Sequence, residues 1–585
     1  MKTGQTARYR ARRNQVHRLA KQLRRKYYAK KIRDLREGDP RNWWRGVKQI
    51  TGQQSKSSNP LSSLAFQLHD GNMQALADNI NTFFHQVAAD LTPLFDISVP
   101  PPSVSIPDEF VIDFAVVEEK MSRINIHKSP GPDGLQNWIL RDFSAQLAGP
   151  VCAIFNASIR EGFVPDRWKE ANVVPVPKAH PPRSIESDLR PISLTSTLGK
   201  LLESIVGTWM LGMIDDKLDN RQYGARRGRS TTHALVDMIH HWHSAIDQRQ
   251  SVRAVFIDYA KAFDHVDHNI LLRKMSALGL PGIIIRWLHS FLSHRRQRIK
   301  IGDVFSEWLE MIAGMSQGSY LGPMTFIVLI DNIKATCLTH KYVDDTTLTE
   351  ILSKMAISGM QGIIEDVVLQ STESGMNINP RKTKEMLIGS AIIKHPPPHI
   401  TVNGAPVEQI AAFKILGVYV SSDLKWTHHV DMICSKVSSR MHFLKQLKRA
   451  GAPIQDLLCF YTTVIRPVME YACPVWHSSL TIAQSNALEA QQRRALRIIY
   501  GDADYLSATI IAGVSSLNVR RAELTRKFYN NNILPNNSCL HYLLPKARDG
   551  NIIQRLRRAN KIESFATGTE RYRKSLIPFS LAHFQ

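Results

Sequence analysis

Hydrophobic and polar positions follow two different rhythms along the chain, and the change between them falls near residue 420. From about residue 110 to that point, short runs rich in β-branched and aromatic residues alternate with longer segments of helical period. Strands are predicted at residues 253–260, 297–305 and 385–390. Farther along, helices are predicted at residues 428–451 and 488–501, each ending in basic residues and Gly. The pattern therefore predicts an α+β region followed by a helical region.

Residues 230–247 show the helical period most clearly. Ser230 is a suitable N-cap, and one face collects the apolar side chains Leu235, Met238, Ile239, Trp242 and Ile246. His240, His241 and His243 lie beside this face. Because no acid or thiol accompanies them at metal-ligand spacing, we expect surface histidines rather than a metal site.

Two stretches interrupt these patterns: residues 53–62 are polar and Ser-rich, and residues 96–109 are rich in proline and cannot be helical. No stretch approaches eighteen consecutive apolar residues, and the first fifteen residues lack the apolar segment of a signal peptide. The six cysteines lie far apart, which excludes a disulfide framework and a zinc module. We expect a soluble intracellular protein, in the nucleus or cytoplasm, that does not contact membranes.

The charge balance narrows the class of partner. Lys and Arg number 75 against 51 acids, a net charge of +24, and such an excess favours nucleic acid. The first 50 residues alone hold 17 basic and three acidic residues, interspersed with Tyr9, Tyr27, Tyr28, Trp43 and Trp44. This arm is either a solvated helix or a surface that contacts phosphates and stacks bases.

Three acids carry the candidate chemistry. Asp258 follows the apolar run AVFI, and Asp344 and Asp345 follow Tyr342 and Val343 at the tip of a predicted hairpin. If the two strands are neighbours, the carboxylates converge, and two divalent cations offset their repulsion, as in nucleotidyl transfer. Hard oxygen ligands favour Mg²⁺, with Mn²⁺ as a substitute. The alternative is an ordinary polar turn.

An ordered series of motifs decides between these alternatives. The segments are SPGPDGL (129–135), VVPVPK (173–178), LRPISLTSTLGKLLE (189–203), QYGARRGRST (222–231), FIDYAKAFDHVDH (256–268), GMSQGSYLGPMTF (314–326), YVDD (342–345), GMNINPRKTK (375–384) and FKILGV (413–418). In sequence and in order, these segments between residues 129 and 418 resemble the reverse transcriptases of non-LTR retrotransposons, most like the jockey group.

The resemblance implies that Asp258, Asp344 and Asp345 are the catalytic, metal-binding acids, the first two as direct ligands. It also implies that Lys178 and Arg190 clamp the triphosphate of the incoming nucleotide, a task suited to a point charge and a bidentate guanidinium respectively. For Arg190 the alternative is an ordinary salt bridge.

Further positions follow from the same motifs. Phe263 matches the ring that excludes a 2′-hydroxyl, although a core ring is the alternative. Gln317 and Gly318 match residues under the new base pair, and Lys382 matches a lysine near the departing phosphates. Leu416 and Gly417 match the turn that grips the primer.

The implied fold is a right-hand polymerase of the α+β class with fingers, an antiparallel palm sheet flanked by helices, and a helical thumb. We expect a basic helical extension at 1–55, a linker at 56–109, fingers and palm at 110–420, a thumb at 421–501 and a basic helical extension at 502–585. The implied substrates are an RNA template, a DNA primer and dNTPs, with a ribonucleoprotein on the element's own transcript as a further partner.

Several features depart from the family pattern. Ala225 replaces an aromatic residue, Tyr320 replaces a β-branched one, and Gly322 is unusual. Nothing before the fingers motifs resembles an endonuclease and nothing after them a ribonuclease H, so we expect an open reading frame shortened at its front. GMSQG also fits the hydrolase pattern G-x-S-x-G, but lacks a suitable strand before it and a positioned His after it. The remaining alternative is a catalytically silent remnant that only binds RNA.

Overall fold

The computed structural model describes residues 59–95, 106–389, 396–501, 503–548 and 562–584, with residues 8–9, 11–20, 22–23 and 26 near the start. The chain divides into two compact units. The sheet unit comprises residues 59–234 and 252–410, and the helical unit comprises residues 235–251 and 411–585 together with 1–58. Within the predicted basic arm, residues 11–20 are helical. Its aromatic residues Tyr27, Tyr28, Trp43 and Trp44 lie outside the described residues.

A five-stranded central sheet organises the sheet unit, in the order β12-β9-β3-β8-β7. Its strands are β3 (Ser251–Ile257), β7 (Leu338–Tyr342), β8 (Asp345–Leu352), β9 (Lys384–Ile388) and β12 (Glu408–Gln409). Every residue of β3 is buried, as expected of a continuous apolar run at the centre of a sheet. The pairs β3–β9 and β7–β8 are antiparallel, and β12 pairs with β9 in parallel. The mixed α+β architecture agrees with the predicted fold class.

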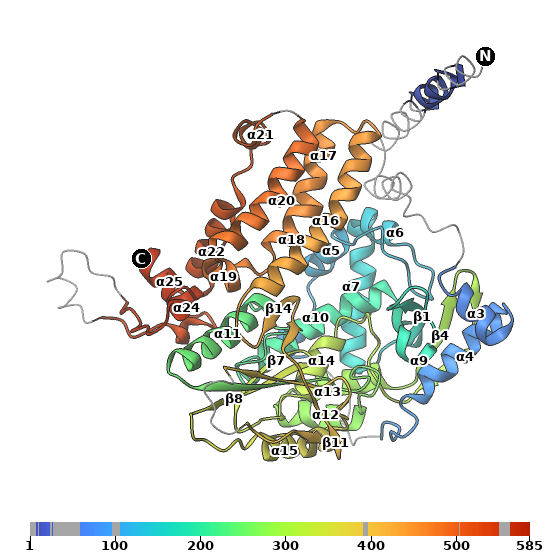
Figure 1. The fold of residues 1–585 in the computed structure, drawn as a ribbon. Coiled ribbons are helices and arrows are strands. Elements are labelled where there is room, and N and C mark those ends of the chain that lie inside the picture. The colour runs from blue at the N-terminus through green and yellow to red at the C-terminus, as the bar shows by residue number, and fades with distance from the viewer. Residues whose placement is uncertain are drawn as a thin grey trace. The chain divides into compact units, whose positions relative to one another are not determined.

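Helices share one hydrophobic core with this sheet, and Figure 1 shows them around it. They are α5 (Phe114–Ser122), α6 (Asn137–Asp142), α7 (Ser144–Glu161), α10 (Thr197–Ile214), α12 (His268–Ala277), α13 (Gly282–Leu292), α14 (Gly322–Leu329) and α15 (Met360–Glu373). Val255 and Ile257 of β3 and Leu348 of β8 pack in this core. The core thereby fixes the strands that carry the acids.

A second sheet, in the order β2-β1-β4-β5 with β6 also paired to β4, completes the unit together with a small hairpin. Its strands are β1 (Glu170–Pro177), β2 (Leu189–Thr195), β4 (Arg295–Ile301), β5 (Val304–Phe305) and β6 (Leu309–Met311), and the hairpin is β10 (Thr401–Val402) and β11 (Ala405–Pro406). Its short helices are α3 (Ser62–His69), α4 (Met73–Gln86), α8 (Asp166–Lys169) and α9 (Ile185–Asp188). The strand predicted at 297–305 is in fact two strands, because Gly302–Asp303 forms a turn between β4 and β5.

The helical unit contains a single named hairpin within the described residues, β13 (Ala412–Ile415) and β14 (Val418–Ser421). Its helices are α11 (Thr231–Asp247, whose first turn belongs to the sheet unit), α16 (Thr427–Arg449), α17 (Ile454–Phe460), α18 (Arg466–Glu470), α19 (Cys473–Trp476), α20 (Ile482–Tyr500), α21 (Tyr505–Ala512), α22 (Leu517–Asn532), α24 (Glu570–Arg573) and α25 (Leu576–His583). Figure 1 shows α16, α17, α18 and α20 side by side. The helix predicted at 488–501 begins earlier, since Thr481 and Gln484 form a capping box.

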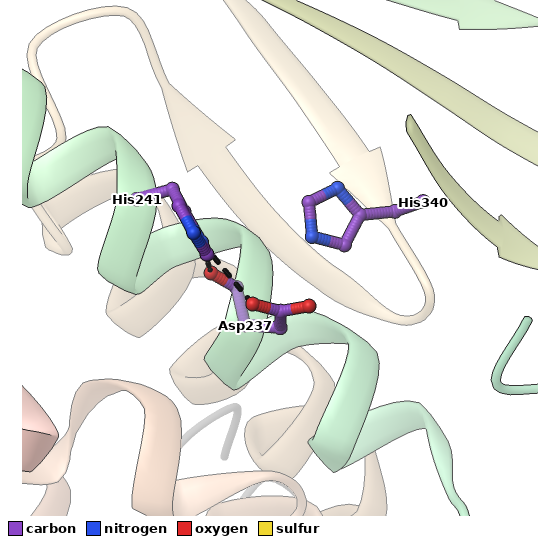
Figure 2. A group of neighbouring side chains, drawn as sticks. All are labelled: Asp237, His241 and His340. Carbon is purple, nitrogen blue, oxygen red and sulfur yellow. Dashed lines mark hydrogen bonds and ion pairs between the residues drawn. The ribbon is translucent and has the colours of Figure 1, made fainter. Parts of the chain in front are cut away.

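The histidines of α11 correct one prediction. His243 is only 2% exposed, and burial lowers its pKa to about 3, so the prediction of a surface residue is wrong. The prediction that no acid stands near these histidines at suitable spacing is also wrong, because His241 Nδ1 lies 3.1 Å from Asp237 Oδ1 one turn earlier. Figure 2 shows this pair; His340, also drawn, belongs to β7 of the sheet unit.

No helix within the described ranges is long and apolar enough to cross a membrane.

Candidate active site

The three predicted acids lie at the ends of adjoining strands. Asp258 directly follows β3, Asp345 begins β8, and Asp344 lies in the turn that joins β7 to β8. Strands β3 and β8 are hydrogen-bonded neighbours in the central sheet. Residues 86 positions apart in the sequence are thereby brought to one place, as the sequence analysis expects.

The electrostatics show that the three carboxylates interact. Burial raises the pKa of Asp344, and the Asp258 carboxylate raises it further. The pKa of Asp345 is raised to about 6, first by the surrounding protein atoms, which exclude water, and then by Asp344 and Asp258. Asp345 still reaches solvent, so this site is crowded but open. Three acids that disfavour each other's ionisation form a site whose charge a cation would neutralise.

Segment 375–384 lines the same place. The backbone N–H of Asp258 donates to Thr383 Oγ1 at 3.3 Å, and the backbone carbonyl oxygen of Asp258 accepts the N–H of Asn379 at 2.8 Å. Lys382 Nζ lies 3.7 Å from Asp258 Oδ2. That separation is an ion pair but no hydrogen bond, and Oδ2 is a buried oxygen without a hydrogen-bond donor. Asp258 therefore keeps a lone pair available for a further ligand.

The turn that carries Asp344 has an unusual backbone. Tyr342 pairs with Asp345, so the loop between β7 and β8 is only Val343 and Asp344. Val343 has a φ of 56°, whereas the loop's other residue does not have a positive φ. This is the φ pattern of a type II′ turn, which normally has Gly at the first position. A β-branched residue in the left-handed region is strained, and such strain persists only where other contacts hold it.

Residues 221–224 supply those contacts. Gln222 is buried, and its Oε1 accepts the N–H of Val343 at 3.0 Å and that of Gly224 at 2.9 Å. The two residues that flank Gln222 also bind the hairpin. The backbone N–H of Lys341 donates to Arg221 O at 2.9 Å, and the backbone oxygen of Lys341 accepts the N–H of Tyr223 at 2.8 Å. A Cβ on Gly224 would lie 2.5 Å from the N and Cγ2 atoms of Val343. Nothing local in the motif QYGARRGRST indicates these contacts, because Gln222 and Val343 are 121 positions apart in the sequence.

The predicted phosphate-binding cations gather in the same unit. Lys178 and Arg190 lie at the loop end of the β1–β2 hairpin, where Val176 pairs with Arg190. The pKa of Lys178 is lowered by desolvation and by the nearby charges of Lys382 and Arg190. Lys178 in turn lowers the pKa of Asp258, although burial outweighs this effect. The structure therefore brings Lys178 and Lys382 within electrostatic range of Asp258, and Arg190 within electrostatic range of Lys178.

Phe263 lies on the loop between β3 and α12, and Gln317 and Gly318 lie on the loop between β6 and α14. The Phe263 ring stacks on Phe326 with ring centres 4.9 Å apart. Gln317 donates from Nε2 to Asp264 Oδ1 at 2.9 Å, and Gly318, with a φ of 133°, packs against Ser193 O of β2. Gly318 thus allows a close approach of backbone to backbone at this position.

These two loops also border an open hollow of about 520 Å³ lined by Ser193, Asp264, Arg295, Arg296, Gln317 and nine further residues. Burial raises the pKa of Asp264, while the amide of Gln317 opposes this rise. Asp264, next to Phe263 in the segment 256–268, is thus a further acid at this hollow, which its position in the sequence alone does not indicate.

Leu416 and Gly417 form the two-residue turn between β13 and β14 in the helical unit. Both have positive φ, 44° and 90° respectively, the pattern of a type I′ turn. Tyr471 donates its hydroxyl hydrogen to Leu416 O at 2.7 Å. A Cβ on Gly417 would lie 2.9 Å from the Tyr471 ring, so this turn is also held by a residue distant in sequence.

Comparison with known proteins agrees with this geometry. Residues 176–420 match the reverse transcriptase (RNA-dependent DNA polymerase) family. The probable RNA-directed DNA polymerase from transposon BS of Drosophila melanogaster is 25% identical over 426 residues, covering 70% of this chain and 47% of that protein. The corresponding protein from transposon X-element is 24% identical over 66% of this chain and 43% of its own length. The RNA-directed DNA polymerase from mobile element jockey, also of Drosophila melanogaster, is 24% identical over 72% of this chain and 46% of its own length.

The chain therefore carries, over residues 176–420, a domain of the reverse transcriptase class. Within that class it is a distant homologue of the polymerases of the non-LTR elements jockey, BS and X-element. It spans less than half the length of these three relatives.

Proposed function

We propose that this chain catalyses RNA-templated DNA synthesis in retrotransposition, transferring a nucleotidyl group from a dNTP to a primer 3′-hydroxyl. The observation that carries the proposal is the meeting of Asp258, Asp344 and Asp345 at adjoining strands within the matched domain. Three neighbouring carboxylates repel one another and so destabilise the fold, because each makes the others harder to ionise. A bound cation would remove this repulsion, so the cluster is better explained by cation binding than by a contribution to stability.

The acids fit two divalent cations. Asp258 Oδ2 is buried without a hydrogen-bond donor, and carboxylate oxygens are the ligands that Mg²⁺ prefers. In this proposal Asp258 and Asp344 are the direct ligands and Asp345 supports them. Bound Mg²⁺ supplies charge neutralisation and activation of the primer hydroxyl.

Side chains around the acids bind the rest of the nucleotide. Lys178, Arg190 and Lys382 attract the triphosphate, since their charges already act on the acids or on one another. Phe263 excludes a 2′-hydroxyl, and its stacking on Phe326 restricts movement of the ring away from the sugar. Gln317 is held in place by its hydrogen bond to Asp264, which suits a residue beneath the new base pair.

The larger arrangement follows from the same assignment. Residues 110–420 form fingers and palm, residues 421–501 form a thumb, and residues 502–585 a helical basic extension. The Leu416–Gly417 turn grips the primer strand, and basic surfaces hold an A-form template–primer by its backbone. The partners are then RNA, a DNA primer and dNTPs, in a nuclear or cytoplasmic setting, with the element's transcript as the natural template.

The decisive experiment is primer extension by the purified full-length chain on an RNA template, with and without Mg²⁺. Asp344→Asn removes one direct ligand at almost constant size, and it should lower the extension rate at least ~10³-fold, or about 4 kcal/mol of transition-state stabilisation. RNA binding and the far-ultraviolet circular dichroism should remain those of the wild type.

The chain contains a matched control. Asp303 also occupies the second position of a two-residue turn, between β4 and β5, so Asp303→Asn should leave extension unchanged. Extension by Asp344→Asn within ~tenfold of wild type would contradict the assignment of Asp344. A wild-type chain that binds RNA but never extends a primer would instead identify a silent remnant.

A further inference from the structure

We propose that Gln222 is a positioning residue that sets the cation affinity of the acids by fixing the Val343–Asp344 turn. This inference depends on the acids being cation ligands, as in the proposed function, but it does not depend on DNA synthesis.

The contacts are those of a brace between two chain segments. Gln222 lies 121 positions before Val343 in the sequence and pairs with Lys341 of β7 in a parallel bridge. One oxygen, Gln222 Oε1, accepts the backbone N–H of Val343 and that of Gly224. The same side chain therefore ties the tip of the hairpin to the backbone of its own segment.

The amide orientation is determined by chemistry. Val343 and Gly224 both present N–H donors, so the oxygen and not the nitrogen of Gln222 must face them. Gln222 Nε2 is then left buried with no hydrogen-bond partner, which is costly. A glutamine held at such a cost, and 1% exposed, is retained for the contacts of its oxygen.

A second anchor on the same segment holds the strand before the turn. Lys341 is buried, and its Nζ lies 3.0 Å from Asp219 Oδ2. Asp219 also accepts the N–H of Arg221 at 2.9 Å. This ion pair secures the root of the hairpin and Gln222 secures its tip, so the two contacts have separable effects.

The physical consequence falls on Asp344. Val343 in the left-handed region is strained, and its N–H would point toward no acceptor if Gln222 Oε1 were removed. The turn would then relax toward a more favourable φ, and such a rotation displaces the next residue, Asp344. Because a shared cation requires both Asp258 and Asp344 within ligand distance, a displaced Asp344 weakens cation binding before it unfolds the protein.

The test is Mn²⁺ binding to the full-length chain without nucleic acid, measured by electron paramagnetic resonance of the free ion. Gln222→Met keeps the side-chain length but removes the acceptor, and it should raise the Kd for Asp344-dependent Mn²⁺ binding at least ~tenfold. Gln222→Asn is too short to reach Val343 and should behave in the same way. Gln222→Glu keeps an acceptor oxygen and should bind Mn²⁺ at least as tightly as wild type.

The matched control is Gln297→Met. Gln297 of β4 is also buried, and its Nε2 donates to Asn81 Oδ1 at 3.2 Å, so its loss reports general destabilisation. Unchanged Mn²⁺ affinity in folded Gln222→Met and Gln222→Asn overturns the inference, and so does an equal weakening in Gln297→Met. If Gln222→Met fails to fold, the difference between Gln222→Asn and Gln222→Glu decides.

The outcomes also separate this inference from the proposed function. Asp344-dependent Mn²⁺ binding that is indifferent to Gln222 overturns the positioning role alone. Wild-type protein that shows no Asp344-dependent Mn²⁺ binding overturns both the positioning role and the two-cation chemistry.

Discussion

Four two-residue hairpin turns in this chain form two pairs with the same backbone and different sequences. The first pair is Gly302–Asp303, between β4 and β5, and Val343–Asp344, between β7 and β8. The first loop residue has a φ of 63° in one and 56° in the other. Glycine adopts this conformation without strain, whereas valine does not.

The second pair repeats the contrast. Asn403–Gly404 joins β10 to β11, and Leu416–Gly417 joins β13 to β14. The φ values are 51° and 77° in the first and 44° and 90° in the second. Asn-Gly is the sequence that a type I′ turn favours, and leucine is a poor substitute for asparagine there.

The difference lies in what holds each turn. Among the residues that the structure describes, no hydrogen bond from outside the hairpin reaches Gly302–Asp303 or Asn403–Gly404. The other two turns each have a distant partner: Gln222 for Val343 and Tyr471 for Leu416. The two turns assigned to catalysis and primer grip are thus the two with unfavourable residues and tertiary braces. Their positions are set by the fold rather than by local sequence.

The largest effect should come from forcing the catalytic turn off its brace. Gly224→Ala places a Cβ 2.5 Å from the Val343 nitrogen, so the hairpin must move. Misplacement of a reacting group by about 1 Å costs ~10²-fold in rate, and we expect a loss of primer extension of at least that size.

Gly362→Ala in α15 is the control, because a Cβ there meets nothing within 4 Å and Gly362 has no positive φ. It should retain full activity and gain slight stability. Wild-type extension rates in folded Gly224→Ala would show that the turn does not depend on its brace.

A smaller effect, and one that sharpens the comparison, is expected from the paired variants Gly417→Ala and Gly404→Ala. Both residues have positive φ, so both variants should lose about 1–2 kcal/mol of stability from backbone strain. Only Gly417 also faces an aromatic ring, Tyr471, at 2.9 Å, whereas nothing lies within 4 Å of a Cβ on Gly404. Extension should therefore fall ~tenfold in Gly417→Ala, with a higher KM for primer, and should hold in Gly404→Ala.

Thermal melting followed by circular dichroism measures the strain, and primer titration measures the grip. Equal losses of primer affinity in the two glycine variants would contradict the assignment of the Leu416–Gly417 turn as the primer grip.

The same comparison explains what the sequence could and could not predict. The place of Asp258 was predictable, because a continuous apolar run followed by one acid is typical of a buried strand that ends at a sheet edge. The break at Gly302–Asp303 was equally open to prediction from its Gly-Asp pair. Val343, in contrast, gives no local signal of a left-handed φ, since valine avoids it. Its conformation follows from Gln222, which only the folded chain brings near.

His243 illustrates the opposite failure. The periodicity of residues 230–247 marks only one apolar face, so the histidine beside that face was predicted to be exposed. In the structure the C-terminal segment covers this side, where the His240 ring lies 5.6 Å from that of Phe565 and 5.8 Å from that of Tyr572. A helix covered on two sides has more buried positions than its own period reveals.

The smallest effect in this comparison should come from removing the brace of the primer-grip turn. Tyr471→Phe deletes the hydroxyl that donates to Leu416 O and leaves the ring that packs on Gly417. One hydrogen bond to a partly exposed carbonyl contributes about 0.5–1 kcal/mol, so the primer Kd should rise ~two- to fivefold with Mn²⁺ affinity unchanged. Tyr542→Phe is the control, because Tyr542 is similarly exposed and donates its hydroxyl to Asp237 in the same unit. A primer Kd equal to that of wild type in Tyr471→Phe would mean that ring packing alone holds the turn, and that this turn, unlike Val343–Asp344, needs no hydrogen-bonded brace.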